Sequence, residues 1–202
     1  MKHVYEFTNQ RKLTKSEFLR WFQKKVWYTI RKFGMIKNGD VVVYENKGDF
    51  RGVVLKDVLK MFVGKGNVEI VKLSTSSFPP TPPNKLASLS KQLTKKHKLT
   101  KFNKLKIARS STLNTESDKL VHNLIKGNAK NLKEFGPVVG KIIKPLYLFL
   151  DEEVLLYAKL KKLKFKKKVE KKDKISNFIE ELEVKHPEIK HAIINSYLKL
   201  YS

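Results

Sequence analysis

The chain has 202 residues, with 44 Lys and Arg against 19 Asp and Glu, a formal net charge of +25, and 41% hydrophobic residues. This composition supports a folded core of one large or two small domains, and the charge indicates a polyanionic partner, with nucleic acid favoured over an anionic membrane. The absence of cysteine excludes disulfides, cysteine-ligated metal and thiol nucleophiles, and no apolar run approaches the roughly 18 residues of a membrane span. The opening residues show no signal-peptide pattern, so we expect a cytoplasmic protein.

The first predicted element is a helix over residues 14–34. Thr14 and Glu17 form a capping-box pattern, with a hydroxyl at the N-cap and a carboxylate three residues later. An apolar stripe at helical spacing follows, and Gly34 ends it. The basic residues lie mostly off this stripe and form either a solvated face or part of an RNA-facing surface. They are Arg20, Lys24, Lys25, Arg31 and Lys32.

A strand–loop–helix unit is predicted next. The run Val41–Tyr44 is typical of a buried strand in a parallel sheet. A glycine-containing loop and an apolar-periodic helix from about Val53 follow it. Nucleotide phosphates often bind such a loop at a helix N-terminus, although Lys47–Gly52 matches neither a Walker A pattern nor a dinucleotide fingerprint.

Strands and helices alternate through the rest of the chain. Further strands are predicted at 68–73 and 105–108, separated by a proline-rich loop at 74–84. The order predicts an α/β sandwich around a mostly parallel sheet. The predicted helices cover 117–126, Asp151 to about Leu160, 173–182, and the residues from Pro187 onward. The expected domains are an N-terminal helical segment (1–37), an α/β domain (38–150) and a C-terminal helical basic region (151–202).

Two lysine clusters are candidate RNA contacts. The lysine segment, residues 161–174, holds nine lysines against two acids, and Leu163, Phe165 and Val169 between them are expected to anchor it on the body of the protein. Residues 85–98 suit a basic amphipathic helix. Lysine–phosphate contacts give affinity with little sequence preference. The candidate RNA-binding residues are Lys161, Lys162, Lys164, Lys166, Lys167, Lys168, Lys171 and Lys172, with Lys91, Lys95, Lys96 and Lys98.

Short motifs keep a common order and spacing along residues 17–200. They are Phe18, Phe22 and Val26 with Gly39–Val43, then Ile143–Leu146, then Glu153–Val154 with Tyr157–Ala158, and finally Asn177–Glu183 with His186–Lys190. In this order they resemble the tRNA 2-thiolation enzymes of the TtuA/TtcA class, which are N-type ATP pyrophosphatases. The resemblance implies a three-layer PP-loop fold with a mostly parallel sheet, truncated and followed by C-terminal helices.

The positions of that family's chemical motifs hold other residues here. The family's CxxC motif falls on Asn84 and Ala87. Its GHNxDDE motif falls on Ser110–Glu116, where only a leucine at the x position and the final glutamate remain. At the positions of the family's ATP-binding loop, SGGKDS, this chain lacks the phosphate-contacting lysine and has a carboxylate that opposes phosphate binding. The resemblance therefore implies a relic nucleotide loop and a pseudoenzyme without catalytic residues, cofactor or metal. The six loop positions are Lys47, Gly48, Asp49, Phe50, Arg51 and Gly52.

These observations together predict a non-catalytic, tRNA-binding scaffold protein. It resembles the partner subunit of the cytosolic wobble-uridine thiolation complex, so the expected partners are tRNA and a catalytically active thiolase paralogue in a hetero-oligomer, without a membrane. Two alternatives stay open. One is a general basic RNA- or ribosome-associated protein, and the other is a divergent nucleotide-dependent tRNA-modifying enzyme that uses the altered loop.

Overall fold

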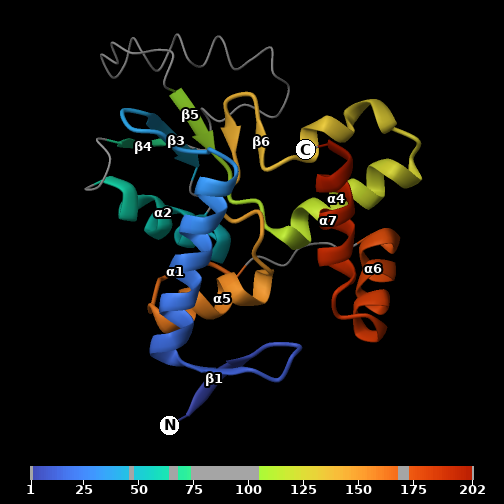
Figure 1. Cartoon of the computed structure of the whole chain (residues 1–202), viewed down its shortest axis with the longest axis horizontal. Coiled ribbons are helices and arrows are strands. Elements are labelled where there is room, and N and C mark those ends of the chain that lie inside the picture. Colours follow the sequence, from blue (N-terminus) through green and yellow to red (C-terminus); the bar gives the residue numbers. More distant parts are fainter. Residues whose placement is uncertain (1, 46–47, 64–67, 74–104, 168–172, 202) are drawn as a thin grey trace.

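The computed structural model describes residues 2–45, 48–63, 68–73, 105–167 and 173–201. Its main sheet has the strand order β4–β3–β5–β7–β6, and all neighbours are parallel except the β6–β7 pair (Figure 1). Parallel neighbours on both sides of β3 explain its unbroken apolar run, which is buried. The strands are β3 (Val41–Glu45), β4 (Glu69–Leu73), β5 (Leu105–Ala108), β6 (Val138–Val139) and β7 (Ile142–Ile143).

Three helices share the main core with this sheet. They are α1 (Lys15–Lys32), α2 (Phe50–Val63) and α5 (Asp151–Leu160). Their buried side chains join Val42 and Tyr44, which alternate to the same face of β3. At the centre, the ring of Phe22 from α1 stacks on that of Tyr157 from α5, with ring centroids 4.1 Å apart.

Helix α1 forms as its sequence predicts. The backbone N–H of Thr14 donates to the Glu17 carboxylate at 2.8 Å, which completes the capping box. Phe18, Phe22, Val26 and Ile30 of the stripe are buried. Gly34 has a φ of +56°, a conformation that costs glycine little, and the Met35 N–H reaches the carbonyl of Ile30 at 3.0 Å.

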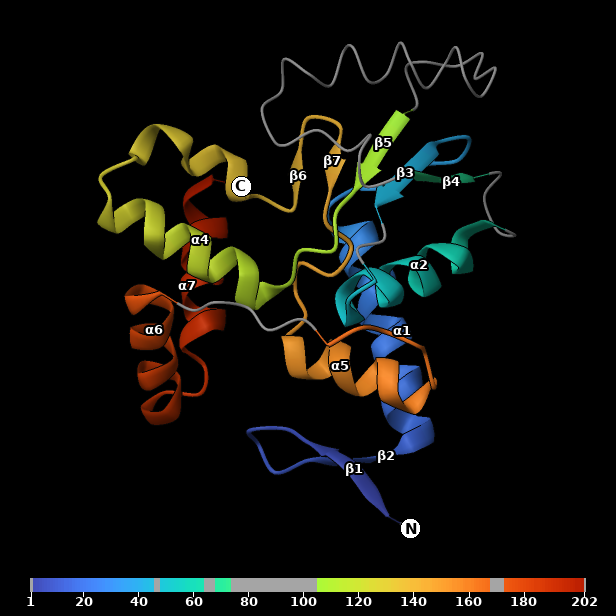
Figure 2. The same cartoon turned by 180° about the vertical axis from the view of Figure 1, so that it is seen from behind.

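A second group of helices packs beside the β6 edge of the sheet (Figures 1 and 2). Leu120 and Tyr197 join them in one small core, and Leu113 and Ile194 meet Tyr147 in another. Asp173 caps α6 by accepting from the Ser176 N–H at 2.9 Å, as expected for a helix that begins there. The group comprises α4 (Leu113–Ile125), the 3-10 helix η4 (Ala129–Phe135), α6 (Lys174–Lys185) and α7 (Ile189–Tyr201).

The first residues form an antiparallel hairpin that the sequence patterns did not predict. It consists of β1 (His3–Glu6) and β2 (Lys12–Thr14). Tyr5 holds the hairpin on the body, because its ring stacks on Trp21 at 5.8 Å and its hydroxyl donates to Glu153 at 3.3 Å. The hairpin therefore packs across the start of α1 and α5.

Helices α2 and α4 begin earlier than predicted, and α2 begins at Phe50 rather than at about Val53. Helix α4 begins at Leu113 rather than Ser117, because Thr112 is its N-cap and accepts from the Thr115 N–H. Helix α5 covers the predicted residues, Asp151–Leu160, with Leu150 as its N-cap residue. Among the helices of the described ranges, none is long and apolar enough to cross a membrane.

Candidate functional site at the carboxyl ends of β3 and β5

The order of the sheet places two loops side by side. Strand β3 is followed by α2 and then by β4, which pairs with one edge of β3, while β5 pairs with the other edge. The order of the strands across the sheet therefore reverses between β3 and β5, which is a topological switch point. Ligands of open α/β sheets bind at such a switch point, outside the carboxyl ends of the strands. The Gly48–Gly52 residues follow β3 here, and Arg109–Thr112 follow β5.

Asp49 caps the helix that follows β3. Its Oδ1 accepts from the Gly52 N–H at 2.8 Å, and its carbonyl accepts from the Val53 N–H at 3.1 Å. The residue is only 7% exposed. A carboxylate here interacts favourably with the positive end of the helix and uses an N–H group that a phosphate would otherwise meet. An anion entering at this helix start would have to displace Asp49.

Arg51 joins the two loops to α5 instead of pointing into solvent. Its Nε donates to Asp151 Oδ1 at 2.7 Å, and a terminal guanidinium nitrogen bonds the other carboxylate oxygen. Asp151 also accepts from the Thr112 hydroxyl at 2.7 Å, while its N–H donates to Asn114 Oδ1 at 2.9 Å. The bidentate pair is mostly buried, with the Arg51 side chain 10% exposed.

Glu116, the acid kept from the GHNxDDE pattern, belongs to a buried ion pair. Its carboxylate lies 2.6 Å from Lys144 Nζ and 3.0 Å from Lys119 Nζ. Burial by itself would raise the pKa of Glu116, but the two ammonium charges and their hydrogen bonds outweigh burial and lower that pKa. Burial lowers the pKa of Lys144, against the opposing charge of Glu116. The pair links α4 to the segment that follows β7.

A polar cleft of about 410 Å³ lies between the starts of α4, α5 and α6, and Arg51, Asp118 and Lys190 contribute to its lining. Burial is the largest cause that raises the pKa of Asp118, to about 6, and the neighbouring carboxylates Asp151 and Glu180 add to it. Within the part of the chain that the structure describes, no group of three or more His, Asp or Glu side chains is placed to hold a metal ion.

The lysine segment begins where α5 ends and runs back to the β3–α2 loop. The backbone N–H of Lys166 donates to the Gly48 carbonyl at 2.8 Å, and the ring of Phe165 meets the ring of Phe50 edge-on at 6.3 Å. Leu163 and Phe165 pack against the main core, as their interleaving with lysines predicts. The lysines on either side of these anchors face solvent: Lys161, Lys162, Lys164, Lys166 and Lys167.

The other candidate residues fall outside the described residues. They include Val169 and the predicted basic helix at 85–98. The candidate lysines outside are Lys47, Lys168, Lys171 and Lys172, with Lys91, Lys95, Lys96 and Lys98.

Sequence reasoning missed the partners of Arg51 and Glu116. Asp151 lies 100 residues after Arg51, and Lys144 lies 28 residues after Glu116. The one local signal was the position of Glu116 and Lys144 within two motifs of the same family resemblance. No pattern of spacing marked Arg51.

Comparisons with known proteins agree with this geometry at the level of the fold. No family model matches the chain. A probable sulfurtransferase of Methanocaldococcus jannaschii is 33% identical over 92 residues, a match that spans 40% of this chain but only 27% of the relative. The solved structure of the U34-tRNA thiolase NcsA from Methanococcus maripaludis, with its [4Fe-4S] cluster, superimposes with a TM-score of 0.71 at 19% identity. It covers 98% of this chain and 84% of the thiolase.

The superposition confirms the predicted fold class, an α/β fold with a mostly parallel sheet like that of a tRNA thiolase. The expectation that the protein is not an enzyme is contradicted, because both similar proteins are enzymes, a thiolase and a probable sulfurtransferase. The iron–sulfur cluster of the thiolase does not fit the residues present here. Such clusters are held by cysteine thiolates, and this chain has none.

Proposed function

We propose that this protein binds tRNA and takes part in uridine 2-thiolation. The observation that carries the proposal is the row of exposed lysines from Lys161 to Lys167, held beside the β3–α2 loop by the Lys166–Gly48 hydrogen bond. A fold shared with a U34-tRNA thiolase supports the choice of tRNA among nucleic acids. The net charge of +25 supports a polyanionic partner of considerable size.

The lysine segment suits phosphate binding because few acids neutralise it. In the described part of the segment, Lys161 has an acidic neighbour, Asp57, at 3.9 Å, which is a loose contact with a side chain that is 37% exposed. Ammonium groups that neutralise phosphates release counterions, so binding should weaken steeply as salt is raised. Contacts of this kind position an RNA and leave its sequence to be read elsewhere.

The absence of cysteine suggests a second partner. A sulfur relay that passes through a protein thiol needs a cysteine, and this chain contains none. We therefore include in the proposal a hetero-oligomer with a thiolase paralogue that carries cysteines. In such an assembly this chain contributes the tRNA-binding lysines, and the paralogue contributes the thiol.

The test is a titration of labelled tRNA at several salt concentrations. The variant Lys164→Glu/Lys166→Glu/Lys167→Glu reverses three charges next to the loop. A matched control, Lys126→Glu/Lys185→Glu/Lys199→Glu, makes the same charge change at exposed positions in the α4, α6 and α7 group.

If each of the three lysines contacts one phosphate, the slope of log K against log salt becomes shallower by about 2 to 3. The control should keep most of the wild-type slope. Equal losses in both variants would contradict the assigned surface. Equal affinity for tRNA and for an unrelated structured RNA of the same length would leave a general RNA-binding protein instead. Co-purification of a cysteine-containing thiolase after nuclease treatment tests the hetero-oligomer.

A further inference from the structure

The outer face of α1 combines exposed aromatic and basic side chains. Tyr28 is 56% exposed near the C-terminal end of the helix, and Lys24, Arg31 and Lys32 around it are exposed as well. These residues and Trp27 line one open groove on the helix surface. Between Arg20 and Lys32 the helix carries no acidic residue, so this face has an undivided positive charge.

The aromatic rings of this face are already arranged around cations. The Arg31 guanidinium lies 5.6 Å from the centre of the Trp27 ring, and the Lys32 ammonium lies 5.6 Å from the centre of the Tyr28 ring. The Trp27 ring packs against the ring of Phe62 from α2, with ring centroids 4.1 Å apart. Tyr28, which is more than half exposed, therefore stands next to a tryptophan that α2 holds in place.

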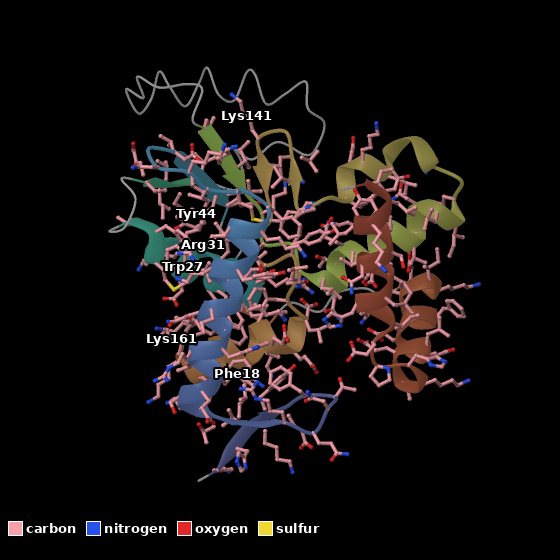
Figure 3. All side chains as sticks on the ribbon, viewed as in Figure 1. Phe18, Trp27, Arg31, Tyr44, Lys141 and Lys161 are labelled. Atoms are coloured by element: carbon pink, nitrogen blue, oxygen red, sulfur yellow. The ribbon has the colours of Figure 1, made fainter. Side chains whose placement is uncertain are left out.

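The face continues toward the lysine segment. Helix α2 lies between them, because Trp27 contacts Phe62 at one end of α2 and Lys161 approaches Asp57 in its middle. Lys56 and Lys60 on α2 are exposed. In Figure 3, Trp27, Arg31 and Lys161 lie along the same side of the molecule.

We propose that this α1 face is a stacking site for an unpaired nucleotide of an RNA. Every nucleobase has a π-face that stacks on an aromatic ring, and arginine and lysine beside the ring bind the flanking phosphates. Duplex RNA keeps its bases stacked on each other, so the base must come from a loop, a bulge or an end. The inference rests on the proposed function, since it takes RNA as the partner, and adds that the bound RNA presents an unpaired base to Tyr28.

The test compares Tyr28→Ala with Tyr28→Phe, which keeps the ring and removes only the hydroxyl. The probes are a short labelled single-stranded RNA and an RNA duplex with the same number of phosphates. Because Tyr28 is exposed, both variants should keep the wild-type melting temperature within a few degrees.

For the single strand, Tyr28→Ala should weaken binding by about five- to a hundredfold with an unchanged salt slope, while Tyr28→Phe binds like wild type. Duplex binding should change little in either variant. Lys24→Ala/Lys32→Ala should lower the salt slope instead. Wild-type affinity of Tyr28→Ala for the single strand would overturn the stacking site, as would equal losses for single strand and duplex.

These results are separable from the test of the proposed function. Loss of the lysine-segment effect with a retained Tyr28 effect would remove the proposed tRNA surface and leave the stacking site. If Tyr28→Ala weakened binding to a protein partner but to none of the RNA probes, the stacking site would be overturned, while the lysine segment would remain the proposed tRNA surface.

Discussion

Replacing Lys144 by methionine should be strongly destabilising. Lys144 is the buried partner of Glu116, with the Lys144 side chain 6% exposed and the Glu116 side chain 1% exposed. The substitution fills the space of the aliphatic stem but leaves the carboxylate without its nearest charge. Breaking a buried pair from one side costs about 3–5 kcal/mol, and the remaining contact to Lys119 favours the lower end of that range.

The size of this loss can be read against the stability of a whole domain. Domains unfold with about 5–15 kcal/mol, so Lys144→Met removes a large share of the total. For a chain of this length, 1 kcal/mol shifts the melting temperature by about 2–4 °C, so a loss of about 3–5 kcal/mol gives a drop of about 6–20 °C. Lys119→Met is the matched control. It removes the other ammonium from the same carboxylate, but Lys119 is 54% exposed, so the cost should stay below about 1 kcal/mol.

Urea unfolding of both variants as a function of pH tests the reasoning. The pKa of Glu116 is lowered in the folded protein, so its contribution is present above the unfolded value near 4.5 and is lost as pH falls through the lower folded value. The difference between wild type and Lys144→Met should therefore be largest at neutral pH and shrink below about pH 4.5. A Lys144→Met loss no larger than that of Lys119→Met, or one that does not change with pH, would refute the argument.

Two further substitutions probe half-buried acidic groups. Asp118 has its pKa raised to about 6, so its protonated form favours folding below the unfolded value near 3.8, and stability falls as pH rises toward 6. Asp118→Asn should remove that fall, which thermal melts between pH 4 and 7 would detect, and an unchanged pH profile would contradict it. Tyr157→Phe removes the hydroxyl that donates to Asp57 at 2.9 Å and should cost about 1–3 kcal/mol in urea unfolding, because the half-buried Asp57 loses that partner. A neutral Tyr157→Phe would mean that solvent replaces the bond.

The parts of the fold that could be predicted are those whose stabilising contacts are local. Helix α1 carries its capping box, apolar stripe and terminal glycine within the residues it uses. Strand β3 is a run of β-branched residues whose burial on both faces follows from its central place in the sheet. For both elements, local propensity and tertiary environment favour the same structure.

The missed parts depend on contacts that are distant in sequence. Residues 3–6 form a strand because Tyr5 packs on Trp21 and bonds Glu153, which lies 148 residues away. The nucleotide-loop positions could be aligned to a known motif, but the contacts that their side chains make could not be predicted from it. Asp49 caps a helix, a role common for Asp but hidden here because the helix was expected to begin only near Val53, and Arg51 pairs with Asp151, a role that has no signature in the loop itself. The exposure of Tyr28 likewise depends on where α2 packs.

Two backbone hydrogen bonds hold the lysine segment, and they determine whether its conformational entropy is lost on folding or on binding. Leu163 N–H bonds the Ala158 carbonyl at 2.9 Å, and Lys166 N–H bonds the Gly48 carbonyl, so the chain between them is already fixed in the free protein. Fixing one residue's backbone costs about 1–2 kcal/mol of conformational entropy. In this segment that cost falls on folding rather than on association with a polyanion. The backbone that carries these lysines is thus pre-organised, and only the flexible lysine side chains need to be ordered when a phosphate backbone arrives.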